Sequence, residues 1–402
     1  MREPKVRGEG QCDRERGLQQ RHGRYRQTQA ERLRQPRRSG KSRRAEASPD
    51  EAVRGRPNRL RDGPRSDLHA LALFPSGARP VRVCGIDNPV AFGKARYGRR
   101  REVSDESAIN SPEREAPEAG VVKRVSERVR RLVAPNPSAF TFTGTCSYIL
   151  GEGEVAILDP GPESDAHLQA LLAATQGERV VAIVVTHTHR DHSALAARLK
   201  AAISAPIVGA RPHLFAAGPV QGLDGSHDRA YAPDLILSDG EIFAIPGVTL
   251  QAIETPGHAA NHLCFAFTQE NSLFSGDHVM AWSTSVVAPP DGSMTDYMAS
   301  LEKLRGRSES LYWPGHGGPV TDPERYLRAV VGHRRQREAS ILARLEDGPM
   351  TIPAIVASVY AGLNPKLIGA ASLSTLAHLE DLVRRGLAVE ERGLYQKGRA
   401  PS

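Results

Sequence analysis

The sequence has few of the features that are typical of secreted proteins and membrane proteins. Its 402 residues include only four cysteines, Cys12, Cys84, Cys146 and Cys264, and no pair has CxxC spacing, so a disulfide framework is not indicated. No uncharged apolar stretch reaches the roughly 18 residues that a membrane-spanning helix needs. No apolar core of a secretory signal peptide stands near the N-terminus. These absences predict a cytoplasmic protein with no membrane partner.

Basic charge is concentrated in one part of the chain. Residues 1–100 hold 26 Lys and Arg against 11 Asp and Glu, whereas residues 101–402 hold 28 against 35. The first hundred residues therefore account for the whole net charge of +8. This segment is rich in Arg, Gln, Gly, Pro and Ser and has no helical or strand period, which predicts a disordered extension over residues 1–120. A nucleic-acid arm, a transit peptide and a segment without function stay open, although the 11 acidic residues argue against the transit peptide.

A second hypothesis for the extension is that the true start of the protein lies later. Between Met1 and Met280 there is no methionine, so a later start would use an alternative codon that is read here as Val or Leu. Val103 is the candidate, because the acidic residues that follow it are typical of the flexible beginning of an enzyme. Mass spectrometry of the native N-terminus distinguishes the two hypotheses.

The most informative stretch is Thr186-His187-Thr188-His189-Arg190-Asp191-His192, which directly follows the apolar run of residues 180–185. The run predicts a buried strand, so the histidines stand at its end. Side chains two residues apart share a face of extended backbone. His187 and His189 are therefore expected to bind one cation, while Asp191 and His192 turn toward a second.

Three further motifs place a possible ligand in a glycine-containing turn after a strand-like run. They are Gly257-His258, Gly276-Asp277 and Gly315-His316. Glycine allows the backbone to bring a ligand close to an ion. Together with the histidine cluster, these motifs predict a metal site assembled from distant parts of the chain.

Five motifs in order resemble those of the metallo-β-lactamase superfamily, over about residues 122–319. They are Asp159 in Leu158-Asp159-Pro160-Gly161, the cluster from His187 to His192, His258, Asp277 and His316. The resemblance implies that His187, His189 and His258 bind one divalent ion, that Asp191, His192 and His316 bind another, and that Asp277 bridges the two. Zinc is the expected metal, with iron and manganese left open, because His and Asp ligands suit all three.

A site of this kind for two metal ions predicts that the protein is a hydrolase. A hydroxide held by the dinuclear metal centre is expected to attack an ester, thioester or phosphodiester bond. Asp191 is placed to orient the hydroxide or accept its proton. Asp159 is expected to hydrogen-bond a metal-bound histidine through the ring nitrogen that does not bind the ion. His262 and His278 stand next to ligands and are candidates for an acid or a substrate contact, with structural hydrogen bonding as the favoured interpretation. Other histidines, such as His333 and His378 on predicted helices, are expected to be solvated.

The order of predicted elements defines the fold class as α/β. Strand-like runs over residues 129–133, 146–150 and 155–158 predict an opening β meander. A helix from Ser193, a polar loop over residues 218–232 and a second set of strands that begins with residues 242–245 are expected to follow. These elements of residues 121–320 predict an αββα sandwich of two sheets, which the resemblance also implies. Beyond it, helices over about 323–345, 352–360 and 372–385, followed by a hairpin near residues 387–396, predict a small α+β winged-helix domain over residues 321–402. A C-terminal winged helix resembles a lactamase-like subgroup that includes single-stranded RNA endonucleases. That subgroup usually has Asn where Cys146 stands.

Three functions stay open. The first is a hydrolase of small esters or thioesters, the second a single-stranded RNA endoribonuclease, and the third a nucleic-acid-binding or dimerising winged-helix protein with secondary catalysis. The 38 residues between Asp277 and His316 leave no room for the domain that larger nucleases of the superfamily insert there. Residues 322–402 carry a charge of only +3, which argues against a strong basic face for RNA. A homodimer is left open.

Overall fold

The computed structural model describes residues 115–214 and 226–398. The predicted extension over residues 1–120 lies outside the described residues as far as position 114, and so do the candidate start at Val103 and part of the polar loop expected over residues 218–232. Within those two ranges, no helix combines the length and the apolar character needed to cross a lipid bilayer.

The first sheet has seven strands in the order β1-β2-β3-β4-β5-β6-β7. The four that come first along the chain form the antiparallel meander that the sequence predicts, and the other three add in parallel. Helix α3 (Asp165–Ala174) connects β4 to β5, and α5 (Ala196–Ile203) connects β5 to β6. The strands are β1 (Val122–Arg124), β2 (Val129–Val133), β3 (Cys146–Glu152), β4 (Glu154–Leu158), β5 (Arg179–Val185), β6 (Ile207–Gly209) and β7 (Leu235–Ile236).

The second sheet has five strands in the order β12-β11-β10-β9-β8. Its pairs are antiparallel except for β11 with β12, which follow each other across helix α6 (Met294–Arg305) and are parallel. The strands are β8 (Ile242–Ile245), β9 (Val248–Glu254), β10 (Leu263–Phe267), β11 (Ser272–Gly276) and β12 (Leu311–Pro314). A short 3-10 turn, η2 (Thr268–Glu270), joins β10 to β11.

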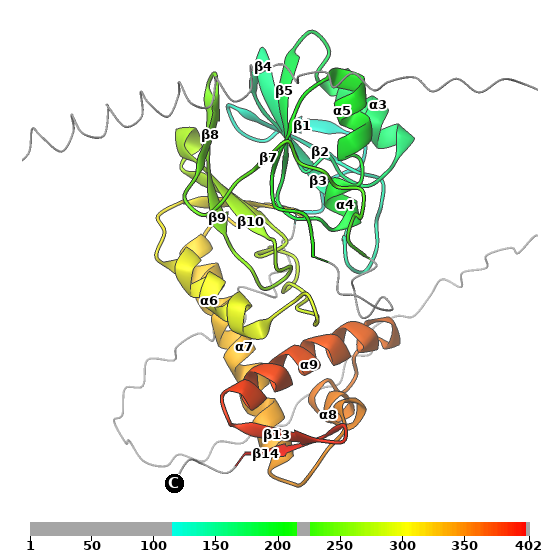
Figure 1. The fold of residues 1–402 in the computed structure, drawn as a ribbon, viewed down its shortest axis with the longest axis vertical. Helices are drawn as coiled ribbons and strands as arrows, with labels where there is room; N and C mark the ends of the chain where they lie inside the picture. The colour runs from blue at the N-terminus through cyan, green and yellow to red at the C-terminus, as the bar shows by residue number, and fades with distance from the viewer. Residues whose placement is uncertain (1–114, 215–225, 399–402) are drawn as a thin grey trace, which may run out of the picture. The chain divides into compact units, whose positions relative to one another are not determined.

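The two sheets pack face to face, and helices cover their outer faces (Figure 1). Strand β10 shows how the sequence encodes this arrangement. Leu263 and Phe265 belong to the core between the sheets, whereas Cys264, pointing the other way, packs in the cluster that contains α6. Because both faces are buried, such strands are apolar at every position instead of alternating. The predicted αββα class is confirmed.

The C-terminal helices and hairpin form the predicted winged helix. Its core joins Ile341 and Leu345 of the first helix to Leu379, Leu382 and other residues of the later elements. The N-terminal half of that first helix packs instead in the core beside the second sheet. The elements are α7 (Pro323–Leu345), α8 (Ile352–Val359), η3 (Pro365–Leu367), α9 (Ile368–Arg384), β13 (Ala388–Glu391) and β14 (Leu394–Lys397). Since α7 belongs to both cores, a domain boundary between residues 320 and 321 stays a prediction.

Local differences from the predicted elements have physical reasons. The helix expected from Ser193 begins earlier, as α4 (Arg190–Ser193), and is interrupted before α5. The interruption arises because the backbone N–H of Leu195 donates to the carbonyl oxygen of Gly161 rather than within the helix. Helix α6 was not predicted, although its buried residues, Met294, Tyr297, Leu301 and Leu304, have helical spacing.

His378 on α9 was expected to be solvated, and this expectation is wrong. The side chain is 2% exposed, and neither ring nitrogen has a hydrogen-bond partner among the described residues. Burial lowers the pKa of His378 from 6.5 to about 3, so the imidazole is neutral in the folded protein. It packs as an apolar ring in the region where α9 meets α7.

We expect this burial to make stability depend on pH. The folded pKa lies below the unfolded value, so the stability that His378 contributes is complete above about pH 6.5 and is lost as the pH falls toward 3. Between pH 7 and pH 5 the loss should be about 2 kcal/mol. Denaturant unfolding of His378→Leu and His378→Gln at the two pH values should show a smaller pH-dependent loss than the wild type. An equal loss in all three proteins would contradict this assignment.

Candidate metal centre

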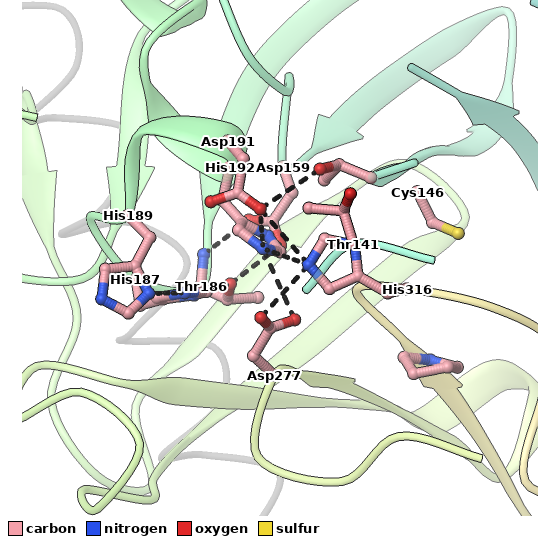
Figure 2. Close-up of polar contacts among 12 residues, drawn as sticks. Thr141, Cys146, Asp159, Thr186, His187, His189, Asp191, His192, Asp277 and His316 are labelled. Carbon is pink, nitrogen blue, oxygen red and sulfur yellow. Dashed lines mark hydrogen bonds and ion pairs between the residues drawn. The ribbon is translucent and has the colours of Figure 1, made fainter. Parts of the chain in front are cut away.

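The predicted ligands come from loops that follow strands, and the two sheets bring these loops to one place. His187 lies two residues after β5, and His258 lies four residues after β9. Asp277 directly follows β11, and His316 follows β12. Asp191 and His192 lie on α4, at the end of the loop after β5. Figure 2 shows Asp277 and His316 facing the cluster of residues 187–192.

Three ring nitrogens meet in a first group. The Nδ1 atom of His189 lies 3.0 Å from the Nε2 atom of His187 and 3.0 Å from the Nε2 atom of His258. A tetrahedral zinc ion with metal–nitrogen distances of about 2.0–2.1 Å would separate its ligands by about 3.3 Å. The three nitrogens therefore lie at the separation that one cation requires.

A second group of three ligand atoms lies beside the first. The Nε2 atom of His316 lies 3.3 Å from Asp191 Oδ2 and 3.3 Å from the Nε2 atom of His192. Asp191 Oδ2 and His192 Nε2 are 3.5 Å apart. Asp191 differs from the other members because 29% of its side chain is exposed, so it lies at the open side of the group.

Asp277 stands between the two groups. Its Oδ1 atom lies 3.4 Å from His192 Nε2, and its Oδ2 atom lies 3.2 Å from His316 Nε2 and 3.7 Å from His258 Nε2. Oδ1 is buried and has no hydrogen-bond partner among the described residues. A buried carboxylate oxygen without a donor is costly unless a cation satisfies it. The residues present therefore fit divalent metal ions.

In His187, His192, His258 and His316, the ring nitrogen that faces away from these groups is held by the surrounding protein. This arrangement fixes the tautomer and the orientation of each ring, as is usual for histidines that bind metals. Four contacts do this: His187 Nδ1 with Thr186 Oγ1 at 3.0 Å, His192 Nδ1 with Asp159 Oδ2 at 3.0 Å, His258 Nδ1 with the Val286 carbonyl at 2.7 Å, and His316 Nδ1 with the Gly144 carbonyl at 3.2 Å.

Asp159 connects the two groups on the side where the histidine rings face away from the ligand atoms. Its Oδ2 atom contacts His192 directly and also accepts a hydrogen bond from Thr186 Oγ1 at 2.8 Å, and Thr186 in turn contacts His187. Its Oδ1 atom accepts from the backbone N–H of Thr186 at 2.8 Å. Asp159 has φ of +50°, a left-handed conformation that costs free energy for a residue other than glycine. These three hydrogen bonds hold it there.

The charges of the two groups differ. Burial, together with neighbouring imidazoles, holds the pKa values of His187 and His189 well below 6.5, so both rings are neutral and have a lone pair to offer. Burial acts the same way on His316, but the carboxylate of Asp277 and the hydrogen bond to Asp191 outweigh it and raise the pKa of His316 to about 9. Binding of a cation at the second group must therefore displace a proton.

Close packing explains the glycines of the ligand motifs. A Cβ atom at Gly315 would lie 2.4 Å from Asp277 Oδ1 and 2.6 Å from His192 Cε1, inside the site itself. Gly257 has φ of +139°, and a Cβ atom there would lie 2.3 Å from the Cα atom of Tyr297. Both positions require glycine, one for the space around the ligands and one for the loop that carries His258.

The residues expected to have other roles are buried. His262 Nδ1 contacts Thr255 Oγ1 at 2.9 Å, and its Nε2 atom accepts from the backbone N–H of Asp277 at 3.2 Å, so its contacts are structural. His278 is fully buried, and burial lowers its pKa to about 3. Cys146 is also fully buried, and burial raises the pKa of its thiol to about 11. None of the three is open to a substrate.

Sequence reasoning missed contacts made by single residues without a spacing pattern. Thr145 Oγ1 lies 3.4 Å from Asp191 Oδ2, and Asn136 fixes Thr145 through two hydrogen bonds. His227 lies against the ring of His189, with centroids 4.5 Å apart, and its Nε2 atom contacts Asp291 at 3.0 Å. The only signal for Thr145 was its place in the Gly144-Thr145 pair. The pairing of His227 with Asp291 has no signal in the sequence.

Comparison with known proteins identifies the two domains. Residues 140–316 match the model of the metallo-beta-lactamase superfamily, and residues 351–397 match that of the beta-lactamase-associated winged helix domain. The chain is 28% identical over 249 residues, 60% of its length, to the atrochrysone carboxyl ACP thioesterase of Aspergillus fumigatus, covering 72% of that protein. It is 27% identical over 321 residues to the lactamase-like protein notP of an Aspergillus species, covering 74% of this chain and 93% of the relative.

Two solved structures have the same fold. A metallo-beta-lactamase family protein from Thermus thermophilus superposes with a TM-score of 0.58 at 25% identity, over 68% of this chain and all of that one. A beta-lactamase domain protein from Burkholderia ambifaria superposes with a TM-score of 0.61 at 21% identity, over 70% of this chain and 95% of that one.

The fold and the His/Asp groups define a hydrolase of the kind that binds divalent metal ions. More particularly, residues 140–316 form a metallo-beta-lactamase superfamily domain, and residues 351–397 form the winged helix associated with that domain. The resemblance stated from the sequence motifs is thereby confirmed.

Proposed function

We propose that this protein is a thioester hydrolase that uses two divalent metal ions, most simply zinc. The observation that carries the proposal is the position of Asp277, whose two oxygens reach toward both ligand groups. In this proposal His187, His189 and His258 hold one ion, and Asp191, His192 and His316 hold the other. When bound, the pair of ions lowers the pKa of a water molecule toward neutrality and polarises the carbonyl oxygen of the substrate.

Asp191 is the residue placed to handle the proton of the reaction. It is the most exposed member of its group, and Thr145 donates to its Oδ2 atom, which orients the carboxylate. Burial would raise the pKa of Asp191, but the charges of His192 and His316 outweigh burial and lower it, so Asp191 is ionised. The oxygen of water joins the acyl carbon, the C–S bond breaks, and the thiol leaves with a proton.

A thioester is favoured over RNA by the charges of the winged helix. The basic pair Arg384 and Arg385 at the C-terminal end of α9 could bind phosphate, yet both side chains form ion pairs within the protein. Arg384 pairs with Asp381 at 2.9 Å, and Arg385 pairs with Asp381 at 2.9 Å and with Glu338 at 2.5 Å. Binding of single-stranded nucleic acid needs a positive groove and aromatic platforms. The relative named as a thioesterase supports the same choice.

Parallel assays of the full-length protein test the proposal. The protein would be loaded with Zn²⁺, Mn²⁺ or Fe²⁺, its bound metal measured, and its activity compared on an N-acetylcysteamine thioester and on labelled single-stranded RNA. We expect thioester turnover with about two metal ions per chain and no cleavage of RNA. Cleavage of RNA with no thioester turnover would replace the proposal with the endoribonuclease alternative.

Asp159→Asn tests the connection that Asp159 makes between the two groups. The amide cannot accept from all three donors that face Asp159, so His192 and, through Thr186, His187 should lose their orientation. We expect metal affinity about 10–100-fold weaker, measured by competition with a chromogenic chelator. Thr186→Val removes only the path to His187 and should weaken one of two binding steps. Unchanged affinity in Asp159→Asn would contradict this role.

A further inference from the structure

A cavity of about 210 Å³ lies beside the metal centre, between the loop of residues 280–286 and the helices of the winged helix. Its walls come from four parts of the chain that are distant in sequence. They are residues 139–140, residues 280–286, His333 and Arg334 on α7, and the segment from Tyr360 to Ser374. The catalytic domain and the winged helix therefore both contribute to it.

Most of the wall is apolar. Met280, Val286, Leu363 and Leu367 line it, and Phe140, which is 50% exposed, lines it as well. An exposed large aromatic side chain at a concave site is typical of a surface that a ligand covers. The cavity is larger than the roughly 150 Å³ that holds one benzene molecule in a protein interior. It has room for about one ring with a substituent.

The cavity adjoins the metal ligands through two of its own residues. The carbonyl oxygen of Val286 accepts the hydrogen bond from His258 Nδ1 at 2.7 Å. Trp282 packs against Gly317, the residue directly after His316. A Cβ atom at Gly317 would be 3.0 Å from Trp282 Cδ1. A group in the cavity thus lies next to residues that support ligands of both groups.

Two polar side chains of the cavity wall each have a nitrogen atom without a hydrogen-bond partner among the described residues. Arg334 is 4% exposed; one of its Nη atoms donates to the Ser285 carbonyl, but its Nε atom has no partner among the described residues. The indole N–H of Trp282 has none there either. Both nitrogen atoms are buried within the wall, so the surface that the cavity presents is chiefly apolar.

We propose that this cavity is the acyl-binding pocket, and that it takes a compact acyl group of about one ring. This inference rests on the proposed thioesterase function. It gives the winged helix a role in acyl specificity, because α9 supplies one wall of the pocket. Long acyl chains exceed the volume, and an acetyl group leaves the apolar wall uncovered.

Hydrolysis of acetyl, benzoyl and decanoyl thioesters of N-acetylcysteamine by the full-length, metal-loaded protein tests the size limit. Burial of one ring should raise kcat/KM for the benzoyl ester about 10–100-fold over the acetyl ester. Decanoyl turnover should be lower than benzoyl turnover. Equal kcat/KM values for all three esters would overturn the proposal.

Variants of the wall test the position of the pocket. Ala370 lines the cavity, so Ala370→Phe should fill it and lower kcat/KM for the benzoyl ester at least tenfold, with acetyl turnover within threefold of the wild type. Leu367→Ala enlarges the cavity and should raise decanoyl turnover relative to benzoyl turnover. Ala357→Phe is the matched control, since Ala357 is exposed on α8 and does not line the cavity. An unchanged benzoyl-to-acetyl ratio in Ala370→Phe would overturn the proposal.

Direct binding separates the pocket from the catalytic proposal. S-benzyl-N-acetylcysteamine is a thioether that cannot be hydrolysed, and Trp282 in the cavity is one of only two tryptophans. We expect a saturable change of tryptophan emission in the wild type and in Ala357→Phe, and its loss in Ala370→Phe. No saturable change in the wild type would overturn the pocket even if thioesters are hydrolysed. Binding without hydrolysis of any thioester would support the pocket and refute the thioesterase function.

Discussion

Asp191→Ala is expected to lower kcat for thioester hydrolysis about 10³-fold. The substitution removes a ligand atom of the second group and the one carboxylate at its open side. Loss of several kcal/mol of stabilisation at a metal centre corresponds to this factor, at about 1.36 kcal/mol for each tenfold. The measurement is kcat together with the metal content of the purified variant. The first group of nitrogens is intact, so we expect at least one ion per chain to remain.

Asp165→Ala is the matched control for this substitution. Asp165 begins α3, 85% of its side chain is exposed, and it pairs with Arg198 rather than with a residue of either ligand group. We expect unchanged kcat and metal content in the control. If Asp191→Ala kept wild-type turnover at a full complement of metal, the two-metal proposal would fail.

Removal of the metal should abolish activity and lower stability at the same time. Without cations, the first group leaves neutral imidazoles buried, and the Oδ1 atom of Asp277 is buried without a hydrogen-bond partner among the described residues. After dialysis against a strong chelator we expect less than about 1% of the activity, because no residue of the site replaces the ions as a source of a nucleophile. Re-addition of about two equivalents of Zn²⁺ should restore it.

The thermal midpoint provides a second measurement on the same samples. Ligand at about 1,000 times its dissociation constant stabilises the folded state by about 4 kcal/mol, so the metal-free protein should melt several degrees lower. The midpoint should recover with the metal that restores activity. Full activity in protein shown by elemental analysis to be free of metal would contradict the proposal.

Much of the fold followed from the sequence because its signals are local. Strands such as β2 and β8 have the predicted bounds, and so does helix α7, whose start is marked by Asp322 accepting from the N–H of Arg325 and by Pro323 in the first turn. Boundaries were less certain where the chain bonds to a distant segment. The break before α5 depends on Gly161, which no local pattern reveals.

The part of the candidate site that could be predicted from the sequence also depended on local signals. His187 and His189 share a face at the end of β5 because of local backbone geometry, and the structure brings them together with His258. The contacts of Thr145 with Asp191 and of His227 with Asp291 join residues 46 and 64 positions apart. Such contacts depend on how loops from two sheets pack, so their residues stand in the sequence as ordinary polar side chains.

The sequence alone was enough to predict the class of the fold and the separate motifs of the candidate ligands, because strand burial and side-chain periodicity are properties of neighbouring residues. Only the tertiary structure decided the rest. It placed Asp277 between the two groups, buried His378 and closed a cavity between residues 280–286 and the winged helix. These features depend on which surfaces pack together, and packing is set by contacts among residues far apart along the chain.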